Sequence, residues 1–243
     1  MKKIIYLISA YFILLTTVFF TACLTDTGNP KPKAFLSSAL SDSDATENAQ
    51  RLFQYLTDMS GSKVVSGQME NAWNDDCNML GRVYDDTGKY PALMGFDFMN
   101  YTSLGYTVTN KQTERAIDFW NGKNYSGTTT VSGKHGIVAF MWHWRDPGAA
   151  GGTTGNFYTE AGNADAYTSY RIPYDTGTDS WKTTSTDYTE MVSDLDTIAA
   201  QLAVLQTAGV PVLWRPLHEA SGNIGKNTGG KAWFWWGDSG DMD

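Results

Sequence analysis

The chain has 243 residues, of which 42% are hydrophobic, and a formal net charge of −8. This acidic balance argues against a nucleic-acid partner, which needs a basic patch. Two cysteines and three histidines are too few for a disulfide framework or a dedicated metal site. We therefore expect a globular protein with no metal and no cofactor.

The first residues predict an export signal. Two lysines are followed by an almost uninterrupted apolar run over 4–20 and by the small-residue site Thr21-Ala22-Cys23, which is the order of a secretory signal peptide. The end of this segment resembles a bacterial lipobox, in which the cysteine is lipidated. We expect residues 1–22 to be removed and Cys23 to anchor the protein at the bacterial outer membrane or cell surface. A plain signal peptide or a short membrane helix are the alternatives.

A tether and a helix follow. Residues 23–43 are rich in Thr, Pro, Lys, Ser and Asp, as in a linker between a membrane and a domain, so the folded domain is expected over 44–243. Asp44 and Glu47 have the spacing of a capping box. They open a helical pattern that ends at Gly61 and has one apolar stripe: Leu52, Phe53, Leu56 and Met59.

The rest of the domain alternates between apolar runs and helical patterns. Strands are predicted at 63–67, 91–98, 136–142 and 210–217, a helix at 111–120, and a long loop at 145–185. The clearest helix begins at Asp187 and ends before Gly209. Its predicted apolar stripe consists of Met191, Leu195, Ile198, Leu202 and Leu205.

The strands are apolar on both faces, as in a parallel sheet covered by helices. Polar residues follow the strand ends: Gln68, Asp97, His143 and Glu219. In a parallel α/β barrel these ends share one face, where active sites are built. An open doubly wound sheet gives a similar pattern and is the structural alternative.

Three segments resemble catalytic or binding motifs but lack a residue or a context that the motif requires. The glycine-rich segment 225–232 nearly matches a phosphate-binding loop, but Ala232 replaces the Ser or Thr that holds magnesium. His218-Glu219 begins like a zinc-protease motif, yet Gly222 stands where its second histidine belongs. Ser221 is in no nucleophile elbow.

The polar cluster of Arg215, His218 and Glu219 remains a candidate functional site. The alternative interpretation is a surface ion pair, but an apolar strand leads into the cluster and tryptophans follow it. We expect Glu219 to be partly buried near indoles, where a carboxyl group can keep its proton at neutral pH and act as a general acid. For His143, between two tryptophans, the alternative is a core histidine.

Two segments resemble glycoside hydrolase family 26, chiefly endo-β-1,4-mannanases: Val-Leu-Trp-Arg-Pro-Leu-His-Glu at 212–219 and Trp-Phe-Trp-Trp-Gly at 233–237. The segments at 66–68, 95–97 and 142–144 support the resemblance, which covers about residue 45 to the end. It implies a (β/α)8 TIM barrel with a retaining mechanism. The loop at 223–232 is longer than in many relatives.

The resemblance also implies roles for single residues. Glu219 matches the acid/base glutamate, His218 the histidine beside it, His143 a histidine that contacts the sugar, and Trp233 a tryptophan of the cleft. Further candidates for substrate binding are Trp236, Trp144, Asp97 and Arg215. The family's nucleophile follows strand seven, whereas this chain ends after strand four, and Glu70 and Glu160 match no nucleophile motif.

The sequence therefore predicts an α/β protein, a TIM barrel truncated after about strand four. We expect an exported endo-glycosidase whose partner is a β-1,4-mannan-type polysaccharide and whose nucleophile is missing from this chain. The alternatives are a non-catalytic glycan-binding lipoprotein, or a family member that cleaves mixed-linked β-glucan or β-1,3-xylan.

Overall fold

In a computed structural model, the chain divides into two units, Met1–Ala39 and Leu40–Asp243. The structure describes residues 40, 42–72, 78–102, 111–123, 135–147, 157–159, 168, 170–220, 222, 232 and 234–237. The predicted signal peptide, Cys23 and most of the tether lie outside these residues. Within them, no helix combines the length and the apolar character needed to cross a membrane.

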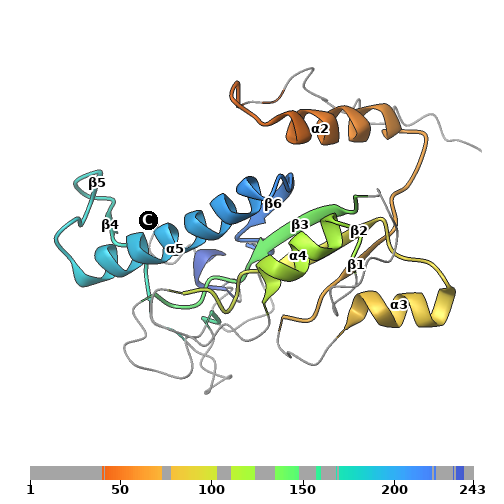
Figure 1. The fold of residues 1–243 in the computed structure, drawn as a ribbon. Helices are drawn as coiled ribbons and strands as arrows, with labels where there is room; N and C mark the ends of the chain where they lie inside the picture. The colour runs from red at the N-terminus through yellow and green to blue at the C-terminus, as the bar shows by residue number, and fades with distance from the viewer. Residues whose placement is uncertain are drawn as a thin grey trace, which may run out of the picture. The chain divides into compact units, whose positions relative to one another are not determined.

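The centre of the domain is a four-stranded parallel sheet (Figure 1). Its strands lie side by side in chain order: β1 (Gly67–Met69), β2 (Leu93–Asp97), β3 (Ile137–Trp142) and β6 (Val212–Pro216). Because every pair is parallel, the carboxyl ends of the four strands meet at one edge. The predicted parallel α/β class is confirmed. The order of the described strands does not reverse, so it lacks the switch point of a doubly wound sheet.

The two central strands form the core because they are apolar on both faces. Met94 and Phe96 of β2 and Val138 and Phe140 of β3 are fully buried. The ring of Phe140 stacks on Phe96 at a centroid distance of 5.4 Å and on Phe98, just after β2, at 4.0 Å. Burial of side chains of this size stabilises the fold by about 1.5–3 kcal/mol each.

The outer strands differ from the prediction. The strand expected at 63–67 is displaced, because β1 begins only at Gly67 and Val64 is 95% exposed. The last strand, expected to be buried on both faces, is exposed over residues 214–216. The reason is its position, since β6 pairs with β3 on one side and with no described strand on the other. Such an edge leaves a row of backbone N–H and C=O groups unpaired.

The described residues hold four α-helices: α2 (Glu47–Met59), α3 (Met79–Thr87), α4 (Gln112–Trp120) and α5 (Thr186–Thr207). α2 begins after Thr46, which caps the Ala49 N–H group, instead of at the predicted Asp44 box. None of its residues is buried, so its apolar stripe is only partly covered. α3 was not expected, although Asn78 caps its start and Gly88 ends it in the left-handed conformation.

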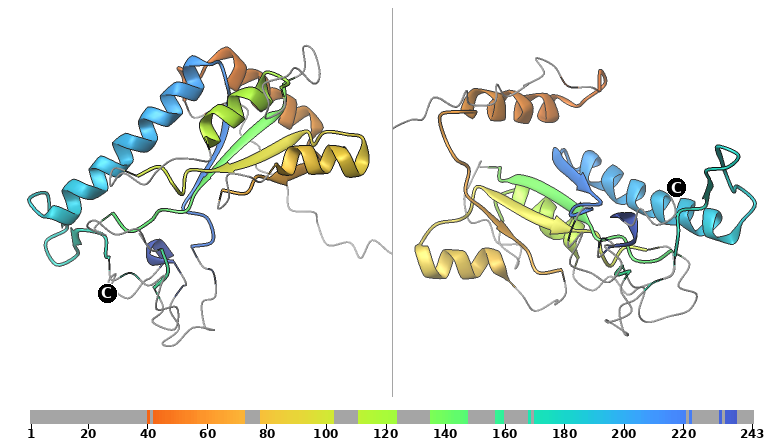
Figure 2. Two further views of the ribbon diagram at one scale, coloured as in Figure 1. Left: turned by 60° about the horizontal axis from the view of Figure 1, so that its bottom comes forward. Right: turned by 180° about the vertical axis from the view of Figure 1, so that it is seen from behind.

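α4 and α5 pack against each other, and α4 also packs on β2 and β3 (Figures 1 and 2). α5 begins one residue earlier than predicted, after Ser185, whose side chain accepts the Tyr188 N–H group. Its predicted stripe is partly confirmed, since Met191, Ile198 and Leu205 are buried. Leu195 is 43% exposed, however, and Asp194 occupies the buried face in its place.

The loops after β3 and β6 are joined to each other. The predicted loop at 145–185 contains a small hairpin, β4 (Tyr174–Asp175) and β5 (Ser180–Trp181). Earlier in this loop, Tyr158 forms an antiparallel bridge with Phe234. Phe234 directly precedes η2 (Trp235–Gly237), a single 3-10 turn. The Trp235 N–H group donates to the Phe157 carbonyl at 3.0 Å, which ties η2 to the loop after β3.

Candidate active site

The polar residues predicted at the strand ends do follow the carboxyl ends of adjacent parallel strands. Asp97 ends β2, His143 follows β3, and Glu219 lies three residues after β6. Parallel pairing brings Asp97 opposite Met141, two residues before His143. Gln68 lies in β1, where its amide donates to the Met69 carbonyl at 2.9 Å. Three of the four predicted positions therefore contribute to one face.

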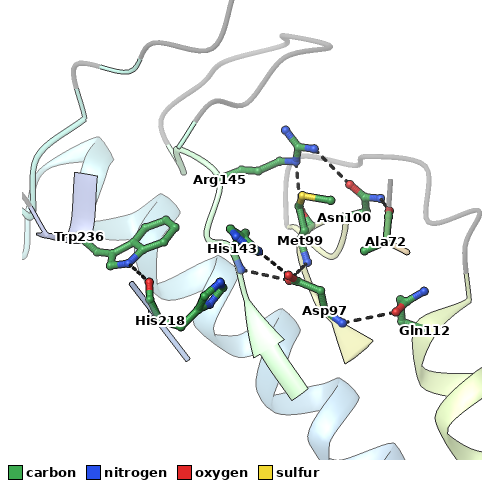
Figure 3. Close-up of polar contacts among 9 residues, drawn as sticks. All are labelled: Ala72, Asp97, Met99, Asn100, Gln112, His143, Arg145, His218 and Trp236. Atoms are coloured by element: carbon green, nitrogen blue, oxygen red, sulfur yellow. Dashed lines mark hydrogen bonds and ion pairs between the residues drawn. The ribbon is translucent and has the colours of Figure 1, made fainter. Parts of the chain in front are cut away.

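Asp97 holds His143 at two points (Figure 3). Its Oδ1 accepts the backbone N–H of His143 at 3.1 Å, and its Oδ2 pairs with the ring Nδ1. Oδ1 also accepts the Met99 N–H at 2.9 Å, and Gln112 accepts the Asp97 N–H at 3.4 Å. Asp97 is buried and fully engaged, so its predicted contact with substrate is corrected to a contact with His143. The His143 Nε2 is then the ring nitrogen that can reach a ligand.

His218 stands beside His143. The two rings are edge to face, with centroids 4.1 Å apart and an interplanar angle of 89°. Burial, followed by the neighbouring His143 imidazole, lowers the pKa of His218, which favours the neutral ring. The His218 Nδ1 is buried without a hydrogen-bond partner, while its carbonyl accepts the Trp236 indole N–H at 3.1 Å. The strand ends of β3 and β6 thus supply a pair of imidazoles.

Glu219 is exposed, so the expectation that it is partly buried near indoles is wrong. Exposure follows from its position beyond the uncovered edge strand β6. Its backbone is left-handed, with φ 55°, as is that of Leu217 with φ 51°. This conformation costs residues other than glycine roughly 1–2 kcal/mol and persists only where the surroundings enforce it, as at many active sites.

Trp144 does not line an open surface. It is buried, its ring stacks on Trp142 at 4.2 Å, and its indole N–H donates to the Asp194 carboxylate at 3.0 Å. Its predicted role in substrate binding is therefore corrected to one in the core. The sequence does carry a signal for this pair, because Asp194 interrupts the apolar stripe of α5, three residues after Met191.

The remaining predicted binding residues are placed differently. Trp236 is half-buried, and its ring stacks on Phe234 at 4.5 Å. Arg215 is exposed near the end of β6, and its charge acts on His218. Trp233 lies outside the described residues. Of these three residues, Trp236 is the one whose aromatic ring is described near the two histidines, at a centroid distance of 6.4 Å from His143.

Glu70 is a buried carboxyl group that motif matching does not nominate. It directly follows β1, and its Oε1 accepts the N–H groups of Asn71 at 3.0 Å and Met79 at 3.4 Å. Arg115 lies 3.9 Å from the same oxygen, while Oε2 has no hydrogen-bond partner. Burial raises the pKa of Glu70 above its ordinary value, against the opposing backbone N–H groups and Arg115. Its signal in the sequence is an acid immediately after a strand.

Side chains also link the loops after β1, β2 and β3 (Figure 3). Arg145 donates to the Met99 carbonyl at 3.1 Å and to the Asn100 side chain at 3.3 Å. Asn100 in turn donates to the Ala72 carbonyl at 3.0 Å. These contacts join residues 28 to 46 positions apart, which no local pattern in the sequence reports. They hold the segment after His143 against its neighbours.

Among the described residues at the strand ends, Glu219 offers an exposed carboxyl group whose charge acts on the adjacent His218 imidazole. Asp97 and Glu70 are buried. An exposed carboxyl with neighbouring imidazoles is suited to proton transfer. Among the described residues, no three His, Cys, Asp or Glu side chains are grouped to hold a metal ion.

Sequence comparisons identify relatives over most of the chain. Residues 41–242 match Glycosyl hydrolase family 26. A mannan endo-1,4-beta-mannosidase of Thermothelomyces thermophilus is 32% identical over 216 residues, which is 87% of this chain and 38% of that protein. Mannan endo-1,4-beta-mannosidase A of a Piromyces species is 28% identical over 208 residues, covering 84% of this chain and 29% of that protein. The chain thus spans well under half the length of these relatives.

Comparisons with solved structures agree with the sequence comparisons. The Podospora anserina GH26-CBM35 beta-(1,4)-mannanase has a TM-score of 0.62 at 34% identity and covers 86% of this chain, which spans 40% of it. A beta-mannanase from a symbiotic protist of the termite Reticulitermes speratus, solved with a gluco-manno-oligosaccharide, has a TM-score of 0.63 at 32% identity. It covers 83% of this chain, which spans 55% of it. The family match over residues 41–242 includes all four strands and their ends, and the chain therefore belongs to glycosyl hydrolase family 26.

Proposed function

We propose that this chain is part of an exported, retaining endo-β-1,4-mannanase in which Glu219 is the general acid and base. The observation that carries the proposal is the exposed Glu219 carboxyl, which directly follows His218 of the His143–His218 pair at the carboxyl end of the sheet and acts electrostatically on that imidazole. The relatives described as mannan endo-1,4-beta-mannosidases support the substrate class.

The chemistry would proceed in two steps. Glu219 first gives its proton to the glycosidic oxygen of the leaving sugar while a nucleophilic carboxylate attacks the anomeric carbon and forms a glycosyl–enzyme bond. Glu219 then takes a proton from water, which attacks the same carbon and releases the nucleophile. His143, fixed by Asp97 through Nδ1, offers Nε2 to a sugar hydroxyl. Burial and the neighbouring His143 lower the pKa of His218, which favours its neutral form beside Glu219.

The nucleophile is proposed to come from outside the four described strands. A retaining site needs two carboxyl groups about 5–5.5 Å apart. Asp97 is occupied by His143, and Glu70 is buried. We place the nucleophile on further strands that would pair with the free edges of β1 and β6 and close a (β/α)8 barrel. Closure removes both edges and would cover Trp214, which is 36% exposed.

A hybrid enzyme tests this proposal. The chain is joined to the barrel-completing residues of the Podospora anserina mannanase, and the release of reducing ends from β-1,4-mannan, mixed-linked β-glucan and β-1,3-xylan is measured. We expect mannan to be cleaved and Glu219→Gln to lower turnover about 10²–10⁴-fold, with binding of manno-oligosaccharide retained. A substrate with a good leaving group needs less protonation, so its first step should lose less.

Two controls separate the alternatives. Glu114→Gln makes the same change at an exposed position on α4 and should leave turnover unaltered. The 243-residue chain alone should not hydrolyse mannan, because we place the nucleophile on strands outside it. Cleavage by Glu219→Gln at the parental rate would remove Glu219 from the mechanism. Binding of oligosaccharide by an inactive hybrid would instead favour a non-catalytic glycan-binding protein.

We also propose that Cys23 carries a lipid anchor at the cell surface or outer membrane. The signal-like segment before Cys23 supports this. In a bacterial host, Cys23→Ser should abolish fatty-acid labelling and release the protein from the membrane fraction. An unlabelled, fully released wild-type protein would contradict the anchor.

A further inference from the structure

The 3-10 turn η2 contacts the backbone on both sides of Glu219. The indole N–H of Trp236 donates to the carbonyl of His218, the residue before Glu219, at 3.1 Å (Figure 3). Gly237 lies against the carbonyl of Ala220, the residue after Glu219. Successive residues of η2 therefore meet the two residues that flank Glu219.

Gly237 is required by this close approach. A Cβ atom placed on it would stand 1.8 Å from the Ala220 oxygen and 2.7 Å from the Ala220 carbonyl carbon. Both are backbone atoms, which cannot rotate away as a flexible side chain does. Any other residue at 237 would have to displace either η2 or the segment that carries Glu219.

η2 is itself held from the other side. Trp235 is buried, and its indole N–H donates to the Trp144 carbonyl, just after His143, at 2.8 Å. Its backbone N–H donates to the Phe157 carbonyl at 3.0 Å. The turn is therefore anchored to the loop after β3, and this anchorage gives it the rigidity to hold the loop after β6.

Glu219 needs such support because its backbone is left-handed, with φ 55°. A strained backbone conformation of this kind persists where neighbouring contacts fix it. A single strained residue on an exposed loop would otherwise relax, and its carboxyl group would move away from the strand ends.

We propose that Trp235, Trp236 and Gly237 form a clamp that positions Glu219. They act as positioning residues: the clamp fixes the peptides on either side of the proposed acid and relates them to the end of β3. Trp236 is thereby given a role other than the sugar contact expected from the sequence. The catalytic consequence depends on the proposed role of Glu219, whereas the clamp itself can be tested without any activity.

The first test uses the 243-residue chain and the exchange of its indole N–H groups, followed by NMR. Trp236→Phe identifies the Trp236 signal, and Trp181→Phe identifies that of a 48% exposed tryptophan in the β4–β5 hairpin. The indole N–H of Trp236 should exchange with solvent about tenfold more slowly than that of Trp181, because it is hydrogen-bonded. Trp236→Phe should also shift the amide signals of Glu219 and Ala220, and Trp181→Phe should not. Exchange at the rate of Trp181, with unshifted Glu219 signals, would overturn the clamp.

The second test uses the hybrid mannanase and separates positioning from sugar binding. Trp236→Phe keeps an aromatic ring and removes the N–H donor together with the five-membered ring that carries it. A displacement of about 1 Å costs on the order of 10²-fold, so we expect kcat to fall by up to about that factor with KM unchanged. Gly237→Ala should act in the same direction, and Gly177→Ala, in the exposed hairpin loop, should not. The loss should shrink for a substrate with a good leaving group.

The outcomes are distinguishable. A raised KM with unchanged kcat in Trp236→Phe would make Trp236 a sugar-binding residue and overturn the clamp. If the hybrid is inactive but the Trp236 indole is protected and coupled to Glu219, the proposed function fails while the clamp stands. If Gly237→Ala does not fold, Trp236→Phe alone decides the question.

Discussion

The carboxylate of Asp97 receives both the backbone N–H and the ring Nδ1 of His143, so a side chain at the end of β2 orients a side chain at the end of β3. An ionised carboxylate only accepts hydrogen bonds, so the Nδ1 of His143 carries the hydrogen. In the neutral ring, Nε2 is then the hydrogen-bond acceptor. The Asp97–His143 pair therefore decides which hydrogen bond Nε2 could make with the proposed substrate.

Asp97→Asn should reverse that arrangement. The amide oxygen can still accept from the His143 backbone, but its NH2 group would face Nδ1 and would move the ring hydrogen to Nε2. We expect the nitrogen NMR signals of His143 to report the changed tautomer, and mannan turnover in the hybrid to fall by about 10- to 100-fold, as when other orienting partners are removed. Asp196→Asn, at an exposed position on α5, is the control. An unchanged tautomer would contradict the prediction.

The buried hydrogen bond between Trp144 and Asp194 should appear as a coupling energy. Trp144→Phe removes one of the donors to the carboxylate, and Asp194→Leu leaves the indole N–H without its acceptor. Each single change should lower the free energy of unfolding by about 1–3 kcal/mol. In urea denaturation, the double variant should lose less than the sum of the two. Strict additivity would show that the two groups do not interact.

Glu70 should make stability depend on pH. Because burial raises its pKa in the folded state, its contribution is present below the unfolded value of 4.5 and is lost as the pH rises through the folded value. Glu70→Gln removes this loss, so its melting temperature relative to the wild type should increase with pH. Each pKa unit of elevation corresponds to about 1.4 kcal/mol. Glu114→Gln, on the exposed side of α4, should follow the wild type, and a Glu70→Gln profile parallel to the wild type would contradict the prediction.

His218 should make stability depend on pH in the opposite direction to Glu70. Burial and the neighbouring His143 lower its pKa below 6.5, so its contribution to stability is present above that value and is lost as the pH falls through the folded pKa. His218→Gln cannot take up a proton. The melting temperature of this variant should therefore fall less than that of the wild type between about pH 7 and pH 5. Ring signals of His218 that titrate above 6.5 would rule out this account.

The helices α2, α4 and α5 and the two central strands could be predicted from local patterns, whereas α3 was not expected. The 3.6-residue periodicity of α5 and the apolar runs of β2 and β3 report which side chains avoid water, and burial is a property each residue carries with it. The same reasoning placed Asp97, His143 and Glu219 at one face, because parallel strands bring their carboxyl ends together. The motif at 212–219 indicated the family, which the match over residues 41–242 shows.

Only the tertiary structure decided the partners of these residues. Asp97 meets His143 through the register of β2 and β3, and Asp194 meets Trp144 across 50 positions. Trp236 of η2 reaches the backbone beside Glu219 across 18 positions. Glu219 is exposed instead of partly buried, because it lies beyond an edge strand. Trp144 is buried instead of available to substrate, because it lies between core rings and α5. Local sequence determines what a side chain can do, and packing between distant segments determines which group it meets.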